Sequence, residues 1–306
     1  MNTLLLTHPD CLRHDTGDAH PESAERLKAA LSALESEEFS YLIREVPPKA
    51  SREQLLLAHT PAYLDQMLAL HEVAPLQLDP DTVISAHSVE AALYAAGAVI
   101  QAVDEVAQGL CRNAFCAIRP PGHHAEPDAA GGFCLFSNVA IGALYARRTY
   151  GFKRVAVVDF DVHHGNGTQA VLRPHKGMFY ASSHQRDLFP HGAATEDQGD
   201  ADGAVLVNVA LPPDGGSREF REAYSATIVP RLRQFHPDFL LISAGFDAHA
   251  ADLLSDVRLQ VEDFAWVTRE LRDFAGGKVV SVLEGGYDLP SLAACVAAHV
   301  RALMGR

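Results

Sequence analysis

The sequence predicts an α/β fold in one domain, with a central parallel sheet that carries helices on both faces. Apolar, β-branched segments bounded by turn residues recur along the chain, and segments with helical periodicity separate them. Strands that alternate with helices of this length are typical of a parallel sheet buried between two helical layers. The chain has 306 residues, 48% of them hydrophobic, with no break in composition. We therefore expect one domain over residues 1–306.

The expected strands are nearly continuous in apolar residues, as strands buried on both faces are. No internal repeat or linker interrupts their alternation with helices. We expect strands at 3–7, 114–120, 154–162, 178–183, 204–212, 239–247 and 278–288, and helices at 21–36, 88–109, 137–151, 218–235 and 261–277.

Charge and cysteine content narrow the class of protein. A formal charge of −14 disfavours non-specific binding to nucleic acid. The five cysteines form no CxxC pair, which argues against a disulfide scaffold or a thiolate zinc site. The first residues lack the features of a signal peptide, and no apolar stretch approaches the roughly 20 residues of a membrane span. We expect a cytoplasmic protein with no membrane and no nucleic-acid partner.

Polar and glycine-rich segments follow four of the expected strands at the point where each ends. RPPGHHA follows AFCAI, DFDVHHGNG follows RVAVV, FDAH follows LLISAG and EGGYD follows VVSVL. Open parallel sheets bind their ligands beyond the carboxyl ends of the strands. We therefore expect the functional site where these four segments meet.

Three residues are candidates for metal ligands. Asp159, Asp161 and His163 are two apart, so an extended backbone would project all three to one side. Carboxylates and an imidazole suit a divalent ion, and Asp247 follows an apolar strand, where a carboxylate is costly without a cation or several donors. Asp161, His163 and Asp247 would leave a position for water, as catalytic sites do. Taken singly, these carboxylates also suit helix caps and the histidines a turn.

Two further segments offer groups for acid–base chemistry. His123 and His124 follow a rigid Pro-Pro-Gly turn, and two imidazoles beside a metal can serve as general base, general acid and electrostatic stabiliser. Tyr287 follows two glycines, and its phenol could donate a hydrogen bond to the oxyanion of a tetrahedral intermediate. Solvated histidines and a tyrosine used for packing are the alternatives.

Five segments, in order, resemble the signatures of the histone deacetylase and acetylpolyamine amidohydrolase family. They are RPPGHHA (119–125), GGFCLFSN (131–138), DFDVHHGNGTQ (159–169), SAGFDAH (243–249) and EGGYD (284–288). HPESAERL (20–27) and AHTPAYL (58–64) extend the resemblance over nearly the whole chain. The chain looks like a class II-like, bacterial-type amidohydrolase, which implies an arginase-like α/β fold.

The resemblance implies one zinc ion on the three ligand candidates, with iron(II) or cobalt acceptable to the same ligands. It implies that His123 and His124 are the catalytic pair and that Tyr287 polarises the acetyl carbonyl. The reaction would be hydrolysis of an acetyl-amide to acetate and a free amine.

The resemblance also implies supporting roles around these groups. Asp159 would bond the first histidine and share a structural potassium site with main-chain oxygens around Asp161, His163 and Ser182. Asn166 stands where class I enzymes carry an aspartate paired with the second histidine. A neutral amide would raise the imidazole pKa less than a carboxylate would.

Around the substrate, the resemblance implies that Gly132, Phe133 and Phe189 line a narrow apolar channel suited to the stem of acetyl-lysine. Ordinary core packing remains an alternative for both phenylalanines. Arg26 resembles an arginine behind the site, although exposed helix arginines are commoner. Leu254 falls where polyamine-selective members are thought to carry a glutamate.

We therefore expect a deacetylase of acetyl-lysine-type peptides or small acetylated amines. An acetylpolyamine amidohydrolase is the alternative, in which Asp252 or Asp256 could supply the charge that Leu254 lacks. An arginase-like ureohydrolase would need further bridging carboxylates for two manganese ions, and Asp247 is followed by Ala248 and His249 instead. A non-catalytic acetyl-ligand-binding protein would lack a catalytic residue, and none is missing. The oligomeric state stays open, with a homodimer or a homotetramer compatible with the sequence.

Overall fold

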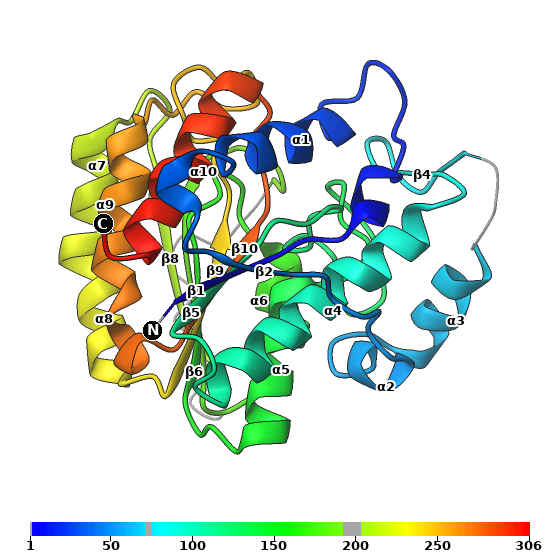
Figure 1. Cartoon of the computed structure of the whole chain (residues 1–306), viewed down its shortest axis with the longest axis horizontal. Helices are drawn as coiled ribbons and strands as arrows, with labels where there is room; N and C mark the ends of the chain where they lie inside the picture. Colours follow the sequence, from blue (N-terminus) through cyan, green and yellow to red (C-terminus); the bar gives the residue numbers. More distant parts are fainter. Residues whose placement is uncertain (1, 71–74, 192–202) are drawn as a thin grey trace.

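A parallel eight-stranded sheet forms the centre of the molecule (Figure 1). The computed structural model describes residues 2–70, 75–191 and 203–306. The strand order is β2-β1-β5-β10-β9-β6-β7-β8, and every neighbouring pair runs parallel. The strands are β1 (Thr3–Leu6), β2 (Ile43–Glu45), β5 (Asn113–Cys116), β6 (Val155–Asp159), β7 (Met178–Gln185), β8 (Val205–Leu211), β9 (Phe239–Ala244) and β10 (Val279–Leu283).

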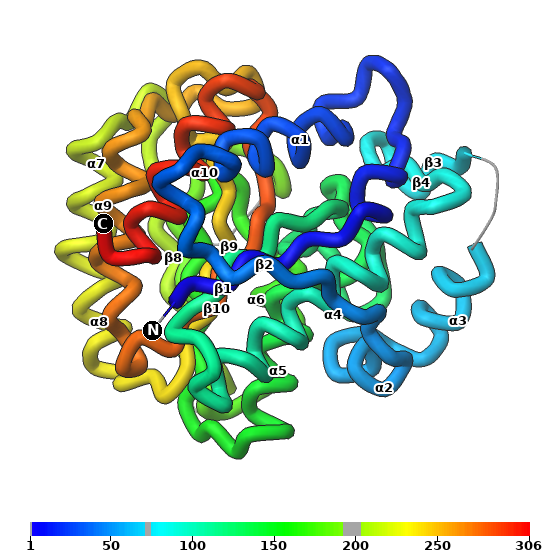
Figure 2. Tube along the Cα trace, viewed as in Figure 1, coloured from blue at the N-terminus to red at the C-terminus, as the bar shows by residue number. Residues whose placement is uncertain are grey.

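Helices cover both faces of this sheet, as the sequence predicts. On one face, α4 (Ser88–Ala107) packs on α5 (Asn138–Tyr150), and α6 (Asn166–Leu172) lies beside α5. On the other face, α10 (Leu289–Leu303) packs between α1 (Ala24–Ala33) and α9 (Val261–Arg272). Figure 2 shows the two layers on opposite sides of the strands. The remaining helices are α2 (Arg52–Leu55), α3 (Pro61–Ala69), α7 (Ser217–Glu222) and α8 (Val229–Phe235).

The central strands are buried because helices cover them on both sides. Every residue of β5, β6, β9 and β10 is buried, which explains their continuous apolar runs. All seven expected strands are present near their predicted positions. The edge strand β2 was not predicted, because its sequence IRE contains the exposed Arg44 and no apolar run.

The expected helix at 218–235 is interrupted by a wider turn. Residues Ala223–Ile228 form a π-helical segment between α7 and α8, followed by Pro230. Proline cannot donate the backbone hydrogen bond of a regular helix, and wider turns absorb such interruptions. The helices α2, α3, α6 and α10 were not among those predicted. Among the described residues, no helix is both long and apolar enough to cross a membrane.

The sheet topology gathers the four chemically unusual segments. The strands β5, β10, β9 and β6 are consecutive neighbours in the sheet although they are far apart in sequence. Because parallel strands end at the same edge, the segments after these four strands meet there. The chain leaves β5 in one half of the sheet and enters β6 in the other, and such switch points create a crevice at the carboxyl edge.

A small antiparallel hairpin lies outside the main sheet. Its strands are β3 (Leu76–Gln77) and β4 (Val83–Ile84). The hydroxyl of Thr82 accepts a hydrogen bond from the backbone N–H of Phe133, at 3.1 Å. This contact brings the turn of the hairpin beside the carboxyl edge of the sheet.

Candidate active site

Asp161, His163 and Asp247 converge at the carboxyl edge. Their ligand atoms lie within 4.8 Å of one another. The Nδ1 of His163 is 3.1 Å from Asp161 Oδ1 and 3.1 Å from Asp247 Oδ2. Ligands at zinc-bond lengths in tetrahedral geometry would lie about 3.3 Å apart. These spacings and this mixture of donors fit a divalent ion.

The predicted strand through residue 162 is wrong, because β6 ends at Asp159. Beyond it the chain turns, and Asp161 Oδ1 accepts a hydrogen bond from the backbone N–H of His163, at 2.9 Å. Asp159 therefore points elsewhere and bonds His123 at 3.1 Å, while Asp161 and His163 face Asp247. The turn, rather than an extended backbone, produces the ligand cluster.

Backbone groups hold the two carboxylates. The N–H of Gly285 donates to Asp161 Oδ2 at 2.8 Å, and the N–H of Val162 donates to Asp247 Oδ1 at 3.0 Å. A Cβ on Gly285 would lie 2.0 Å from Asp247 Oδ2, and one on Gly245 would lie 2.0 Å from Asp161 Oδ2. The site therefore requires glycine at both positions. Neither carboxylate caps a helix, so that alternative is wrong.

The electrostatics of the cluster also favour a cation. Burial, followed by repulsion from Asp161, raises the pKa of Asp247 to about 7. Burial lowers the pKa of His163, but its hydrogen bonds to both carboxylates outweigh this and raise that pKa to about 10. The two buried carboxylates therefore favour a positive charge beside them, here the protonated imidazole of His163. A divalent ion would supply that charge in place of a proton.

The tandem histidines are buried beside this cluster rather than solvated. His123 and His124 are 3% and 5% exposed, and their ring centroids are 4.0 Å apart. Burial lowers the pKa of His123, but Asp161 and Asp159 outweigh it and raise the pKa to about 10. Burial, then repulsion from His123 and His163, lowers the pKa of His124 well below its ordinary value. The structure therefore favours the protonated form of His123 and the neutral form of His124.

Hydrogen bonds also set which nitrogen of His124 carries the proton. Asn166 donates from Nδ2 to Glu126 Oε1 at 2.7 Å, so its Oδ1 faces His124 Nδ1 at 2.8 Å. Because this oxygen only accepts, Nδ1 of His124 carries the hydrogen and Nε2 is left as the proton acceptor. Glu126 was not predicted, because nothing in its sequence context marks it.

Glu284 fixes the loop that carries the histidines. This buried carboxylate accepts from the N–H groups of Gly122 and His123, at 2.7 and 3.2 Å, and from the hydroxyl of Ser243 at 3.0 Å. Burial raises its pKa to about 7. It lies in the EGGYD segment, but only the three-dimensional contacts show that it supports β5's loop rather than the substrate.

Behind Tyr287 lies a buried charge network. The guanidinium of Arg26 is 4.7 Å from the centroid of the Tyr287 ring and donates to the carbonyl of Gly286. Arg26 is fully buried, so the exposed-helix alternative is wrong. Glu22 pairs with Arg26 at 2.9 Å and with Arg119 at 2.5 Å. Glu22 and Arg119 were not predicted, since they meet across 97 positions of sequence.

A narrow cavity of about 210 Å³ opens onto the site. The rings of Phe133 and Tyr287 meet edge to face at 5.8 Å, and those of Phe189 and His124 at 4.9 Å. The cavity is lined by Asp81, His124, Gly132, Phe133, His163, Leu188, Phe189, Leu254 and Tyr287. Every predicted substrate-contacting residue thus lies on this cavity, and Asp81 and Leu188 were not predicted.

Gly132 forms one wall of the cavity where a side chain has no room. A Cβ at this residue would lie 2.4 Å from His124 Cδ2 and 2.9 Å from Phe189 Cε1. Its φ of 52° also favours glycine. The GGF segment therefore brings backbone, rather than a side chain, against the second histidine.

The acids near Leu254 do not line the cavity. Asp252 is 5% exposed and accepts three backbone hydrogen bonds, from Leu254, Tyr287 and Asp288. Asp256 accepts from the amide of Gln185 at 3.0 Å. Asp81, from the β3–β4 turn, is the carboxylate among the described cavity residues. Burial, then Asp79, raises its pKa to about 6.

An apolar groove of about 530 Å³ adjoins the cavity and shares Leu254 and Tyr287 with it. Leu253 is 94% exposed and Leu289 is 36% exposed on its rim. These leucines give the groove an apolar rim next to the mouth of the cavity. The groove is completed by Pro21, Asp288 and Pro290.

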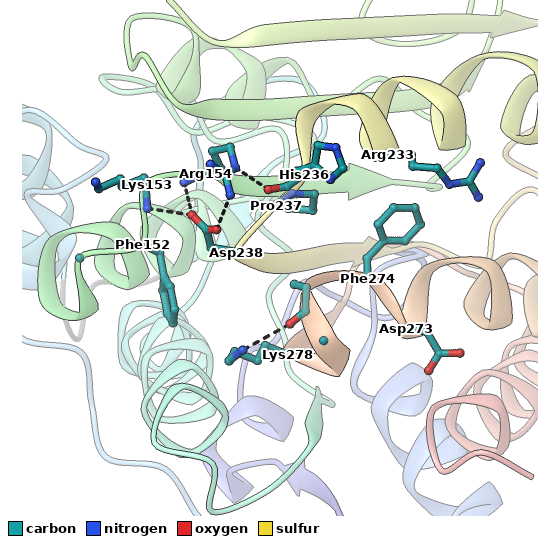
Figure 3. A pocket seen from close by; sticks show the side chains of 13 residues that line it. Phe152, Lys153, Arg154, Arg233, His236, Pro237, Asp238, Asp273, Phe274 and Lys278 are labelled. Carbon is teal, nitrogen blue, oxygen red and sulfur yellow. Dashed lines mark hydrogen bonds and ion pairs between the residues drawn. The ribbon is translucent and has the colours of Figure 1, made fainter.

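A larger hollow of about 840 Å³ lies at the opposite edge, where β6, β9 and β10 begin (Figure 3). Arg154 bonds Asp238 at 2.7 Å, and Lys278 lies 3.4 Å from the carbonyl of Ala275. Figure 3 shows Lys153 and Arg233 pointing toward opposite sides. The polar groups that line this hollow bond one another or point apart, and they do not converge on a common point. The hollow is larger than the cavity beside His124, but its described lining residues form no cluster of catalytic groups.

Known proteins share this fold and these motifs. Residues 20–303 match the family described as the histone deacetylase domain. The chain is 39% identical over 293 residues to the histone deacetylase-like amidohydrolase of Pseudomonas aeruginosa, covering 93% of this chain and 76% of that protein. The HDA15 HD domain matches with a TM-score of 0.95 and 31% identity, over 100% of this chain and 88% of that one. The chain belongs to the histone deacetylase family.

One relative of the chain has a name that refers to a polyamine substrate. The chain is 36% identical over 326 residues to the polyamine deacetylase HDAC10 of Homo sapiens, which covers all of this chain. It spans 48% of that human protein. Membership in the family therefore leaves the substrate to be argued from the site.

The network behind Tyr287 makes a testable contribution to stability. Burial raises the pKa of Glu22, but Arg119 and Arg26 outweigh it and lower that pKa to about 2. Glu22→Gln leaves two arginines without their buried counter-charge, so we expect a loss of about 3–5 kcal/mol in the free energy of unfolding at pH 7. Urea denaturation would measure it.

The pH dependence of the unfolding free energy shows whether the ionised Glu22 carboxylate is the source of this stability. Because the pKa of Glu22 falls from 4.5 in the unfolded chain to about 2 in the folded protein, its ionised form stabilises the fold at pH values above 4.5. This stabilisation is lost as the pH falls from 4.5 toward about 2. The wild type should therefore lose more stability than Glu22→Gln between pH 5 and pH 3. Glu38→Gln is the control, because Glu38 pairs with Arg301 at the surface and should cost at most about 1 kcal/mol. Equal costs for the two variants would contradict the assignment.

Proposed function

We propose that the chain is a metal-dependent deacetylase that hydrolyses acetyl-lysine-type amides or small acetylated amines to acetate and a free amine. The observation that carries this proposal is the buried Asp161, His163 and Asp247 cluster at the end of a narrow cavity. The tandem histidines and Tyr287 line or adjoin the same space. These are the components of metal-assisted amide hydrolysis.

Zinc is the ion that these ligands suit best, and iron(II) or cobalt would fit the same donors. When bound, the ion would polarise the amide carbonyl and activate the attacking water. A two-metal ureohydrolase site would need further bridging carboxylates. Among the described residues, Asp161, His163 and Asp247 are the one group that could hold a metal, and the nearby Asp252 is occupied by backbone donors. A single ion is therefore favoured.

The narrow cavity would admit the acetylated side chain. The rings of Phe133 and Phe189, together with the backbone of Gly132, offer apolar walls to an alkyl stem. Tyr287 would direct its hydroxyl to the carbonyl oxygen and donate a hydrogen bond as negative charge develops. Arg26, behind the ring, holds the loop through the carbonyl of Gly286.

The two histidines would divide the proton transfers. His124 has Nε2 free to accept the proton of the attacking water, because Asn166 fixes the hydrogen on Nδ1. His123 bonds Asp159, which also accepts from Tyr180 at 3.1 Å. A histidine protonated in this environment would donate to the departing amine. The amide of Asn166, unlike a carboxylate, leaves His124 without a neighbouring negative partner at Nδ1.

We also propose a structural potassium ion, which the family resemblance implies. Asp159 and Ser182 are direct partners across β6 and β7. Main-chain oxygens from both strands and from the turn at Asp161 and His163 would be its ligands. Oxygen donors of this kind suit a hard cation.

An acetylpolyamine amidohydrolase is the second candidate. Asp81 favours it, because a carboxylate on the cavity could pair with an internal ammonium group. Leu254 and the adjoining apolar groove favour a substrate whose amine side is apolar or peptidic. A carboxylate can equally accept hydrogen bonds from peptide N–H groups. We therefore rank acetyl-lysine-type substrates first. A panel of acetylated peptides, acetylated polyamines and small acetamides, assayed with zinc-loaded protein, would test this order.

The metal ligands can be tested one at a time. We expect Asp161→Ala, His163→Ala and Asp247→Ala each to lose bound metal and activity, because each removes one of three protein ligands. Loss of supporting residues alone costs about 10–100-fold in metal sites, so these losses should exceed that. Metal analysis beside turnover would measure them. His249→Ala is the control, since its Nδ1 accepts from the nearby N–H of Ala251 and it does not belong to the ligand cluster. A ligand variant with full metal content and turnover would remove that residue from the site.

The phenol of Tyr287 has a separate signature. Tyr287→Phe should keep its metal and its fold but lower kcat by about 10²-fold or more, as expected for the loss of an oxyanion donor. Steady-state kinetics would show it. Tyr224→Phe removes a buried hydroxyl that contacts Ser183 instead, and its kcat should match the wild type. A rise in KM with unchanged kcat would make Tyr287 a binding residue and contradict the mechanism.

Substrate preference can be shifted at Leu254. We expect the wild type to hydrolyse an acetyl-lysine peptide at least as well as acetylspermidine, and Leu254→Glu to move the ratio of kcat/KM toward the polyamine by up to about fivefold. The gain is small because a partly exposed ion pair contributes about 0–1 kcal/mol. Asp81→Asn, in parallel, shows whether that acid already recognises the cation. A strong preference of the wild type for acetylspermidine would favour the second candidate.

A further inference from the structure

Asp252 joins two loops that carry different parts of the proposed chemistry. One loop follows the metal-ligand candidate Asp247, and the other carries Tyr287. Asp252 Oδ2 accepts from the backbone N–H groups of Tyr287 and Asp288, at 2.6 and 3.2 Å, and Oδ1 accepts from that of Leu254 at 3.1 Å. A carboxylate with three backbone donors is a strong, directional connection.

The first loop is itself fixed to the ligand cluster. The hydroxyl of Ser255 donates to the main-chain carbonyl of Asp247 at 2.7 Å, and the N–H of Asp252 donates to the carbonyl of His249 at 2.9 Å. The N–H of Ala250 pairs with the carbonyl of Leu259 at 2.9 Å. The position of the Asp252 carboxylate is thereby tied to the position of Asp247.

The second loop depends on such a connection because it follows two glycines. Gly286 has a φ of 121°, a conformation that side-chain-bearing residues rarely adopt. The ring of Tyr287 contacts Arg26 and Phe133, and Arg26 also donates to the carbonyl of the preceding Gly286. The backbone N–H of Tyr287 itself is held by its short hydrogen bond to Asp252.

We propose that Asp252 is a positioning residue that sets the place of the Tyr287 hydroxyl relative to the Asp161, His163 and Asp247 cluster. The inference rests on the proposed deacetylase function, in which Tyr287 and the metal must address the same carbonyl oxygen. Misplacement of a catalytic group by about 1 Å can cost on the order of 10²-fold in rate. A carboxylate one loop away therefore controls turnover without touching the substrate.

Asp252 does not act by recognising substrate charge. It is 5% exposed, it does not line the cavity, and both of its oxygens are occupied by backbone donors. Its effect should therefore appear in kcat, whereas loss of a substrate contact would appear in KM.

A double-mutant cycle with Tyr287 tests the inference. Asp252→Asn retains the shape of the side chain but places an amide N–H₂ against backbone donors. We expect it to lower kcat about tenfold for an acetyl-lysine peptide, with KM within about twofold and one equivalent of metal retained. In a Tyr287→Phe background, the same change should lower kcat by less than about twofold, because the hydroxyl it positions is already absent.

Asp263→Asn is the matched control for loss of a buried capping carboxylate. Asp263 is fully buried and accepts from the N–H of Gln260 and the hydroxyl of Ser217, at 3.0 and 2.5 Å, at the start of α9. It also pairs with the guanidinium of Arg221 at 2.9 Å, so its loss should cost the fold at least as much as the loss of Asp252. Asp263→Asn should lower the thermal midpoint as Asp252→Asn does, while kcat stays at the wild-type value. If Asp252→Asn yields too little folded protein, Asp252→Ser, which keeps one acceptor oxygen, takes its place in the cycle.

The outcomes separate the inference from the function on which it rests. Equal losses from Asp252→Asn in both backgrounds, or a loss of metal, would show that Asp252 acts on the fold or on Asp247 and would overturn the inference alone. An unchanged kcat in Tyr287→Phe would remove the proposed role of the phenol, and the inference with it. A wild-type protein without acetamide hydrolysis would contradict the proposed function itself.

Discussion

The burial of negative charge at the carboxyl edge of four neighbouring strands constrains the rest of the structure. Asp161 and Asp247 have no access to solvent, and their oxygens meet backbone N–H groups and one imidazole. Such charges are tolerated only where donors or cations surround them. The requirement fixes glycine at 245 and 285, the turn after β6 and the close packing of β6, β9 and β10. The same rule governs Glu22 between its two arginines.

Much of this arrangement could be predicted from sequence because its parts are local. Apolar runs located the buried strands, and the polar segments after four of them predicted the edge where Asp161, His163 and Asp247 meet. The order of five motifs indicated a resemblance to the deacetylase family, and the family match over residues 20–303 confirms that resemblance. The extended backbone expected through residue 162 was wrong, because an aspartate side chain can bond the backbone two residues later and turn the chain.

The features that were missed depend on contacts distant in sequence. Glu22 meets Arg119 across 97 positions, and Asp252 meets Tyr287 across 35. Glu284 supports a loop 162 positions earlier. Nothing in the local composition of these residues distinguishes them from surface acids and bases, whose usual place is in solvent. Asp81 likewise reaches the cavity only because a short hairpin packs on the GGF segment.

The apolar groove beside the cavity has a consequence for inhibitor design. Its rim leucine, Leu253, lies outside the five sequence segments that carry the family resemblance, and it is 94% exposed. A compound whose narrow arm enters the cavity and whose aromatic head rests between Leu253 and Leu289 would bury surface that water now covers, at about 25 cal/mol per Å² of apolar area. Part of the affinity of such a compound would then come from that head rather than from its metal-binding end.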